Sequence, residues 1–140
     1  MVRIYTGEIE AGSAAAFGLA MSRRGSGGRV AVVRFLRSET SGEAESAVKL
    51  GIEVFLNPSA GGRASAQKGW RTALGLCEAG DRDLLVLDGL LDAVEAGIIP
   101  PADVETLFGF PLELVLTGRK APVELVKRAH TVVEMLDIKH

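Results

Sequence analysis

The chain has 140 residues, a length that suits one domain with a buried hydrophobic core. Aliphatic side chains must form that core, because hydrophobic residues make up 47% of the sequence and aromatic residues only 5%. The formal net charge is −2 with both signs interspersed, which argues against a nucleic-acid partner or an anionic membrane surface. We predict a single domain over residues 1–140, in which a charged ligand such as a phosphate would bind only locally.

The single cysteine excludes an intramolecular disulfide and a cysteine-based metal cluster. Cys77 follows Trp70, Ala73 and Leu74 at helical spacing, so we predict a buried structural thiol on a helix that Trp70 packs against a sheet. The N-terminus runs into residues 2–5 without the layout of a signal peptide, and no apolar stretch is long enough to span a bilayer. We therefore expect a cytoplasmic protein.

Short apolar runs alternate with helical patterns along the first half of the chain. Residues 30–36 form a nearly continuous β-branched run, typical of a strand covered on both faces. Ser13 is the expected N-cap of the first helix, and the glycine-rich stretch 25–28 ends that helix. The predicted strands of this half are 3–6, 30–36 and 52–55, and its predicted helices are 13–24, 43–50 and 64–79.

The second half continues the alternation with strands at 84–87, 112–116 and 132–135, and helices at 90–96, 102–108 and 122–128. The whole pattern predicts an α/β fold with about six strands, a mostly parallel sheet and helices on both faces. In such sheets ligands bind beyond the carboxyl ends of the strands. The strands that end near Thr6, Asp88 and Leu116 should therefore open on one common cleft.

Several stretches, in the same order along the chain, match one known family. The most specific is 116–122, LTGRKAP, followed by Glu124 and Leu125. The other stretches are residues 5–7, 15–20, 32–36, 42–43, 84–88, 133–135 and 139–140. Together they resemble the ATP:corrinoid adenosyltransferases, P-loop proteins that transfer the 5′-deoxyadenosyl group of ATP to the cobalt of a reduced corrinoid. The resemblance implies a P-loop NTPase-like three-layer sandwich, MgATP and a corrinoid as ligands, and a role in cobalamin biosynthesis or salvage.

The loop that binds phosphates in this family departs from its pattern here. In the family it reads Gly, any residue, Gly, Lys, Gly, Lys, Thr, Thr, and its backbone N–H groups surround the phosphates. In this chain residues 7–14 read GEIEAGSA, so Gly7 and the hydroxyl of Ser13 remain, whereas Gly12 stands where the phosphate-binding lysine would be. Ile9 and Ala11 replace glycines, and a side chain in the left-handed region costs roughly 1–2 kcal/mol.

Two carboxylates in the same stretch also oppose a polyphosphate. Glu8 and Glu10 each repel a unit negative charge at about 6 Å by on the order of 3 kcal/mol at an effective dielectric near 20. The anion preference of a helix N-terminus is only about 0.3–1 kcal/mol. We predict a degenerate phosphate loop with lost or weakened ATP binding. From the residues alone, it is a plain strand-to-helix turn capped by Ser13.

Two further residues, Asp88 and Arg119, carry alternatives that the sequence leaves open. Asp88 either ligates Mg²⁺ together with the hydroxyl of Ser13 or caps the helix that follows it. Arg119 either faces a ligand phosphate or pairs with a nearby carboxylate. Arg34 and Arg37 are expected at a solvated strand edge. The candidate catalytic residues are Asp88 and Arg119, the candidate nucleotide-binding residues are Gly7, Gly12 and Ser13, and the candidate Mg²⁺ ligands are Ser13 and Asp88.

Two functions remain compatible with the sequence. One is a degenerate homologue that is kept as a corrinoid-binding, regulatory or assembly protein. The other is an active adenosyltransferase whose nucleotide contacts come from unusual positions. A third function, a P-loop kinase or ATPase of another kind, meets the same difficulty with the altered loop, and the other matching stretches do not support it.

Self-association is a further prediction. With 17 glycines and few aromatic residues, this small chain is expected to leave part of a helical face uncovered, which favours a homodimer. Members of the family often self-associate, so the resemblance implies the same. We expect light scattering at high micromolar concentration to report a dimer, and a monomer at that concentration would contradict the prediction.

Overall fold

The structure is a computed structural model that describes residues 1–37 and 41–139. Strands and helices alternate along it in the predicted order. The strands are β1 (Val2–Gly7), β2 (Val30–Phe35), β3 (Glu53–Asn57), β4 (Leu84–Asp88), β5 (Glu113–Thr117) and β6 (Thr131–Met135). The helices are α1 (Ile9–Gly25), α2 (Gly42–Lys49), α3 (Gly62–Ala79), α4 (Leu90–Glu95), α5 (Pro101–Leu107) and α6 (Val123–Arg128), with a short 3-10 turn at Ser59–Gly61.

The strands form one six-stranded sheet in the order β3-β2-β4-β5-β1-β6. Each neighbouring pair is parallel, which confirms the predicted parallel sheet. The parallel arrangement follows from the helix that returns the chain across the sheet after most strands. β2 and β4 lie inside the sheet and are buried along their full length, as their continuous apolar sequences predict.

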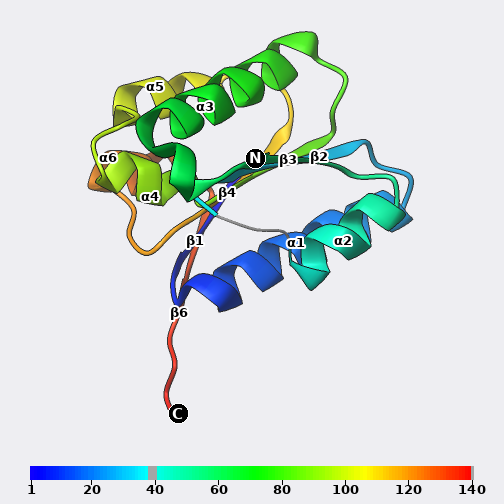
Figure 1. The fold of residues 1–140 in the computed structure, drawn as a ribbon, viewed down its shortest axis with the longest axis horizontal. Coiled ribbons are helices and arrows are strands. Elements are labelled where there is room, and N and C mark those ends of the chain that lie inside the picture. The colour runs from blue at the N-terminus through cyan, green and yellow to red at the C-terminus, as the bar shows by residue number, and fades with distance from the viewer. Residues whose placement is uncertain (38–40, 140) are drawn as a thin grey trace.

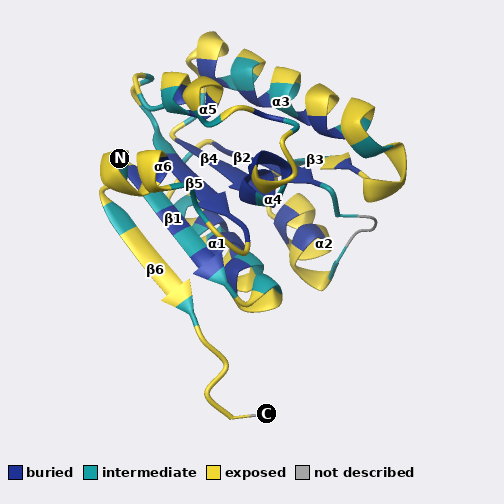
Figure 2. Ribbon diagram, turned by 90° about the vertical axis from the view of Figure 1, so that its left-hand side faces the viewer, coloured by how far each residue is buried: buried dark blue, intermediate teal, exposed yellow. Residues whose placement is uncertain are grey.

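Helices cover both faces of the sheet and make a three-layer sandwich, as predicted. α1 and α2 lie on one face, and α3, α4, α5 and α6 lie on the other (Figure 1). In Figure 2 the central strands are dark blue because both layers of helices exclude water from them. As predicted, β1, β4 and β5 are neighbours and their carboxyl ends lie at the same edge of the sheet.

The alternation of side chains along each strand decides which residues face α1. In β4, Leu85 and Leu87 belong to the core beneath α3–α6, whereas Leu84 and Val86 belong to the core beneath α1. Asp88, two residues after Val86, therefore lies on the α1 side of the sheet. Arg34 of β2 and Thr117 of β5 follow the same rule, because each lies two residues after a residue of the α1 core, Val32 in β2 and Val115 in β5.

Two predictions about α3 are confirmed. Cys77 is buried in the core, and this burial raises the pKa of its thiol to about 11. Trp70 and Leu74 pack, partly buried, against the same core. Among the described helices, none is both long and apolar enough to cross a membrane.

An ion pair at the far end of α1 ties this helix to the sheet. The Arg23 guanidinium donates two hydrogen bonds to the carboxylate of Glu113, with Nε–Oε1 at 2.9 Å and Nη2–Oε2 at 3.3 Å. Arg3 of β1 adds a longer contact of 3.7 Å between Nε and Oε2. The hydrogen bond from Arg23 holds the pKa of Glu113 below its ordinary value of 4.5, although partial burial acts in the opposite direction.

This lowered pKa makes the stability of the fold depend on pH. The ionised carboxylate is favoured in the folded state, so its contribution is complete above about 4.5 and is lost as the pH falls through the lower folded pKa. In urea unfolding, Glu113→Gln should be less stable than the wild type at neutral pH, and the difference should shrink below pH 4.5. Glu124→Gln, at an exposed position of α6, serves as the control. A difference for Glu113→Gln that stays constant with pH would contradict the prediction.

Candidate active site at the carboxyl edge of the sheet

Three polar residues from neighbouring strands meet on the α1 side of the sheet. Arg34 in β2 and Asp88 in β4 are direct partners across the parallel ladder. Thr117 ends β5, one residue beyond Leu116, which pairs with Leu87 of β4. The register of the sheet therefore brings Arg34, Asp88 and Thr117 into one row.

Asp88 is the centre of a buried hydrogen-bond network. Its side chain is fully buried, and its Oδ1 accepts hydrogen bonds from the hydroxyls of Ser13 and Thr117, both at 2.7 Å. Its Oδ2 accepts a hydrogen bond from Nε of Arg34 at 3.0 Å. The guanidinium of Arg34 also lies over the ring of Phe17, 5.6 Å from the ring centre. A guanidinium and two hydroxyls of the protein thus compensate the buried carboxylate.

The structure corrects two sequence interpretations of this network. Asp88 does not cap the next helix, because the N-cap of α4 is Gly89, whose N–H donates to Thr117 Oγ1 at 2.8 Å. Arg34 does not lie at a solvated edge, because only 6% of it is exposed. The reason is the strand order, which places β2 between β3 and β4, with α1 covering this face.

The turn after β1 is shorter than a loop that surrounds phosphates. Gly7 ends β1 with φ +98°, and a side chain there would overlap the carbonyl oxygen of Met135. α1 then begins at Ile9, so the prediction that Ser13 is the N-cap is wrong. Ser13 lies in the second turn of α1, where its hydroxyl reaches Asp88.

Glu8 is the N-cap of α1. Its carboxylate accepts hydrogen bonds from the N–H of Glu10 at 3.3 Å and from the N–H of Ala11 at 2.7 Å. These N–H groups have no partner within a helix, and a carboxylate near the positive end of the helix dipole is favourable. The plain strand-to-helix turn is therefore what the structure contains, with Glu8 in place of Ser13 as its cap.

The rest of the stretch is ordinary helix. Among the described residues other than glycine, positive φ occurs at Leu36, so Ile9 and Ala11 avoid the strain that a wound loop would impose on them. Gly12 is buried and faces Tyr5 of β1 at a distance that would permit a side-chain Cβ.

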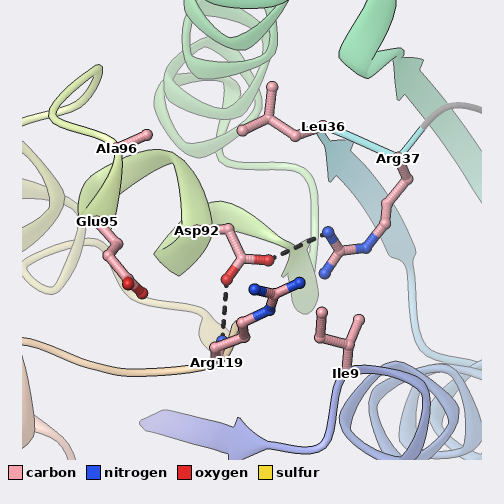
Figure 3. A pocket seen from close by; sticks show the side chains of 7 residues that line it. All are labelled: Ile9, Leu36, Arg37, Asp92, Glu95, Ala96 and Arg119. Carbon is pink, nitrogen blue, oxygen red and sulfur yellow. Dashed lines mark hydrogen bonds and ion pairs between the residues drawn. The ribbon is translucent and has the colours of Figure 1, made fainter.

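A pocket of about 420 Å³ opens beyond the strand ends (Figure 3). Asp92 of α4 accepts a hydrogen bond from Nη1 of Arg37 at 3.1 Å and another from the backbone N–H of Arg119 at 2.9 Å. The expectation of a solvated edge is wrong for Arg37 as well, because its side chain is only 16% exposed and is paired with Asp92. The residues that line the pocket are Ile9, Leu36, Arg37, Asp92, Glu95, Ala96 and Arg119.

Arg119 lies just after the end of β5, next to the end of β1. The Gly7 N–H donates to the carbonyl of Arg119 at 3.1 Å, which joins the two strand ends. Its guanidinium extends into the pocket and has no ion pair with a carboxylate in residues 1–37 and 41–139 (Figure 3). The sequence left open whether Arg119 pairs with a carboxylate. Its backbone N–H does, with Asp92, and its guanidinium does not among the described residues.

Comparison with known proteins decides the family. The family model described as ATP:corrinoid adenosyltransferase BtuR/CobO/CobP matches residues 1–140. The chain belongs to this family. A protein of Pseudomonas aeruginosa named corrinoid adenosyltransferase is 29% identical over 153 residues, an alignment that covers 98% of this chain and 75% of that protein.

In this fold Ser13 and Asp88, both candidates from the sequence, are in contact, and the further partner of Asp88 is Arg34, which the sequence placed at a solvated edge. The missed signal was the alternation Val30, Val32, Arg34, which points Arg34 to the same side as two core residues. Across residues 1–37 and 41–139, no three His, Cys, Asp or Glu side chains gather as a metal cluster.

A second cavity, of about 460 Å³, adjoins this network. Its lining residues are Ile9, Glu10, Ser13, Arg34, Arg37, Ser41 and Glu43. It lies between the first turns of α1 and the start of α2. Glu10 and Glu43 give this space two carboxylates.

The buried pair should dominate the stability of the site. Arg34→Met leaves the Asp88 carboxylate buried without its cation, and we expect a loss of about 3–5 kcal/mol in the free energy of unfolding. The double variant Arg34→Met/Asp88→Asn should lose less than Arg34→Met alone, because no uncompensated charge remains. Arg29→Met, which breaks an exposed pair with Asp83, is the matched control for urea unfolding. Equal losses for Arg34→Met and Arg29→Met would contradict the assignment.

Proposed function

We propose that this protein is a corrinoid adenosyltransferase homologue in which MgATP binding is lost or weakened. The observation that carries the proposal is the carboxylate of Glu8 on the N–H groups of Glu10 and Ala11. A triphosphate held at the start of α1 would need these same N–H groups. The chain thus supplies its own anion where the nucleotide would place a phosphate.

Electrostatics support the same proposal. Glu8 and Glu10 flank the turn, Gly12 supplies no positive charge, and Ser13 uses its hydroxyl on Asp88. Each carboxylate repels a nearby phosphate charge by on the order of 1–3 kcal/mol, depending on solvent screening. The helix dipole, worth about 0.3–1 kcal/mol, does not offset two such terms.

The Mg²⁺ that would accompany ATP does not fit the residues present. Both oxygens of Asp88 already accept hydrogen bonds, one from Arg34 and the other from Ser13 and Thr117. A cation at this carboxylate would have to displace the guanidinium, which is itself buried and positively charged. We therefore assign Asp88 a structural role and no part in metal binding.

Such a homologue would serve in corrinoid binding, regulation or assembly, and membership of the family is what supports these roles. The alternative is an active adenosyltransferase with unusual nucleotide contacts. It is favoured by the cavity that lies against Ser13 and Arg34, which is large enough to admit part of a nucleotide. Binding measurements separate these two functions.

Calorimetric titration with MgATP is the deciding experiment. We expect a dissociation constant above about 1 mM, equivalent to a binding free energy weaker than about −4 kcal/mol. Gly12→Lys should recover little, because Glu8 still occupies the N–H groups. Replacing residues 8–14 with the family's loop should strengthen binding, since it removes Glu8 and Glu10 and restores both glycines and the lysines.

Glu124→Gln on α6, remote from the turn, serves as the control for a change of charge. Micromolar MgATP binding by the unaltered protein would contradict the proposal and favour the active enzyme. Titration with a corrinoid, in the absence of ATP, then tests whether the homologue retains the second ligand of the family.

A further inference from the structure

The two edges of the sheet are β3 and β6, and the backbone of β3 is open on one side (Figure 2). The N–H of Leu36 donates to the carbonyl of Asn57, so the backbone groups of Asn57 face β2. These groups alternate in direction along a strand, and those of Val54 and Leu56 therefore face away from β2. An open strand edge of this kind is a template on which another strand can pair.

The side chains beside this edge are apolar. Val54 packs partly buried against the core beneath α1, and Leu56, two residues later, lies on the same face of the sheet with 42% of it exposed. Val48 of α2 is 57% exposed. These three residues line a groove of about 330 Å³ between α2 and β3. Exposed aliphatic side chains gathered beside an open edge favour association with another chain.

The opposite edge is better protected against pairing. β6 carries Glu134 near its centre, and a charged side chain within an edge strand is one of the means by which proteins prevent unwanted pairing. In β3 the charged residue is Glu53, which stands at the first position and forms an ion pair with Arg82. The rest of β3 is left without a charge that would repel a second strand.

The exposed face of α2 adds two opposite charges to the groove. Glu45 and Lys49 line it and are exposed, and neither forms an ion pair within residues 1–37 and 41–139. The chain reverses at Gly51, so α2 and β3 run in opposite directions. Lys49 therefore lies toward the start of β3, and Glu45 lies toward its end.

We propose that the β3 edge binds a second copy of this chain, with the two β3 strands antiparallel about a two-fold axis. With Phe55 on the axis, Val54 of each copy lies opposite Leu56 of the other, and the two residues exchange backbone hydrogen bonds. Their side chains meet on the α2 face of the joined sheet and close both grooves. The same axis makes the two α2 helices antiparallel, so Lys49 of each copy faces Glu45 of the other.

The surface is complementary to itself, which favours a second copy over an unrelated partner. A strand that pairs with its own copy needs opposite residues whose backbones both face the open edge, and Val54 and Leu56 meet this condition. The two-fold axis also needs an acid and a base at exchangeable positions, and α2 supplies both. β2, β4 and β5 separate β3 from the turn after β1, so this proposal stands independently of the one on MgATP.

Sedimentation equilibrium of the whole chain, without nucleotide, measures the association. We expect a dimer at high micromolar concentration, and Leu56→Lys should raise its dissociation constant at least about tenfold, because it places an ammonium group in an apolar interface. Val133→Lys on the β6 edge, where the valine is 38% exposed, is the matched control and should dimerise as the wild type does. A monomeric wild type, or an effect of Leu56→Lys no larger than that of Val133→Lys, would overturn the proposal.

Charge reversal on α2 tests the same interface without a change in β3. Lys49→Glu and Glu45→Lys should each associate roughly tenfold more weakly than the wild type, because like charges then face each other at two symmetric contacts. An equimolar mixture of these two variants should form a heterodimer at least as tight as the wild-type dimer, since every facing pair is again of opposite sign. Recovery in the mixture also shows that both variants fold. A mixture that associates no better than either variant alone would overturn the proposal.

Discussion

The carboxylate of Asp88 is the constraint on which the rest of this site depends. It is fully buried at the end of a central strand, and a lone charge there would cost several kcal/mol. Arg34, Ser13 and Thr117 compensate it from β2, α1 and β5. Four elements are thereby fixed to one another at the edge where ligands bind in α/β sheets. The hydroxyl of Ser13 ties the second turn of α1, close to the turn that follows β1, to this carboxylate.

Most of the fold is predictable from the sequence because its signals are local. The β-branched run 30–36 and the compact strand 84–87 lie between glycines and charged residues, and these boundaries recur in the structure within one or two residues. The buried thiol of Cys77 follows from helical spacing alone. Local patterns are sufficient wherever a residue's environment is decided by its own element.

The errors arise where the environment is decided by another element. Ser13 has the side chain of an N-cap, but the N–H groups of Gly7 and Glu8 donate to the carbonyls of Arg119 and Met135, respectively, and α1 begins directly after them, at Ile9. Arg34 was expected in solvent because the order of strands cannot be inferred from the sequence. The contact of Arg37 with Asp92 spans 55 residues and depends on the same order.

On the proposed function, the contact of Arg34 with Asp88 and the contact of Glu8 with the start of α1 have the same effect: each takes the place of a part of MgATP. MgATP would bring a divalent cation toward Asp88 and a polyanion toward the start of α1. Arg34 provides the positive charge for the first position, and Glu8 provides the negative charge for the second. Arg34 compensates a buried carboxylate, and Glu8 accepts from N–H groups that have no partner within the helix. If only one of these two contacts were present, either the carboxylate of Asp88 or the N–H groups at the start of α1 would still lack a partner. With both contacts, neither group needs MgATP to compensate it. The hydroxyl of Ser13 has a role in this arrangement without a metal, because it donates a hydrogen bond to the carboxylate of Asp88.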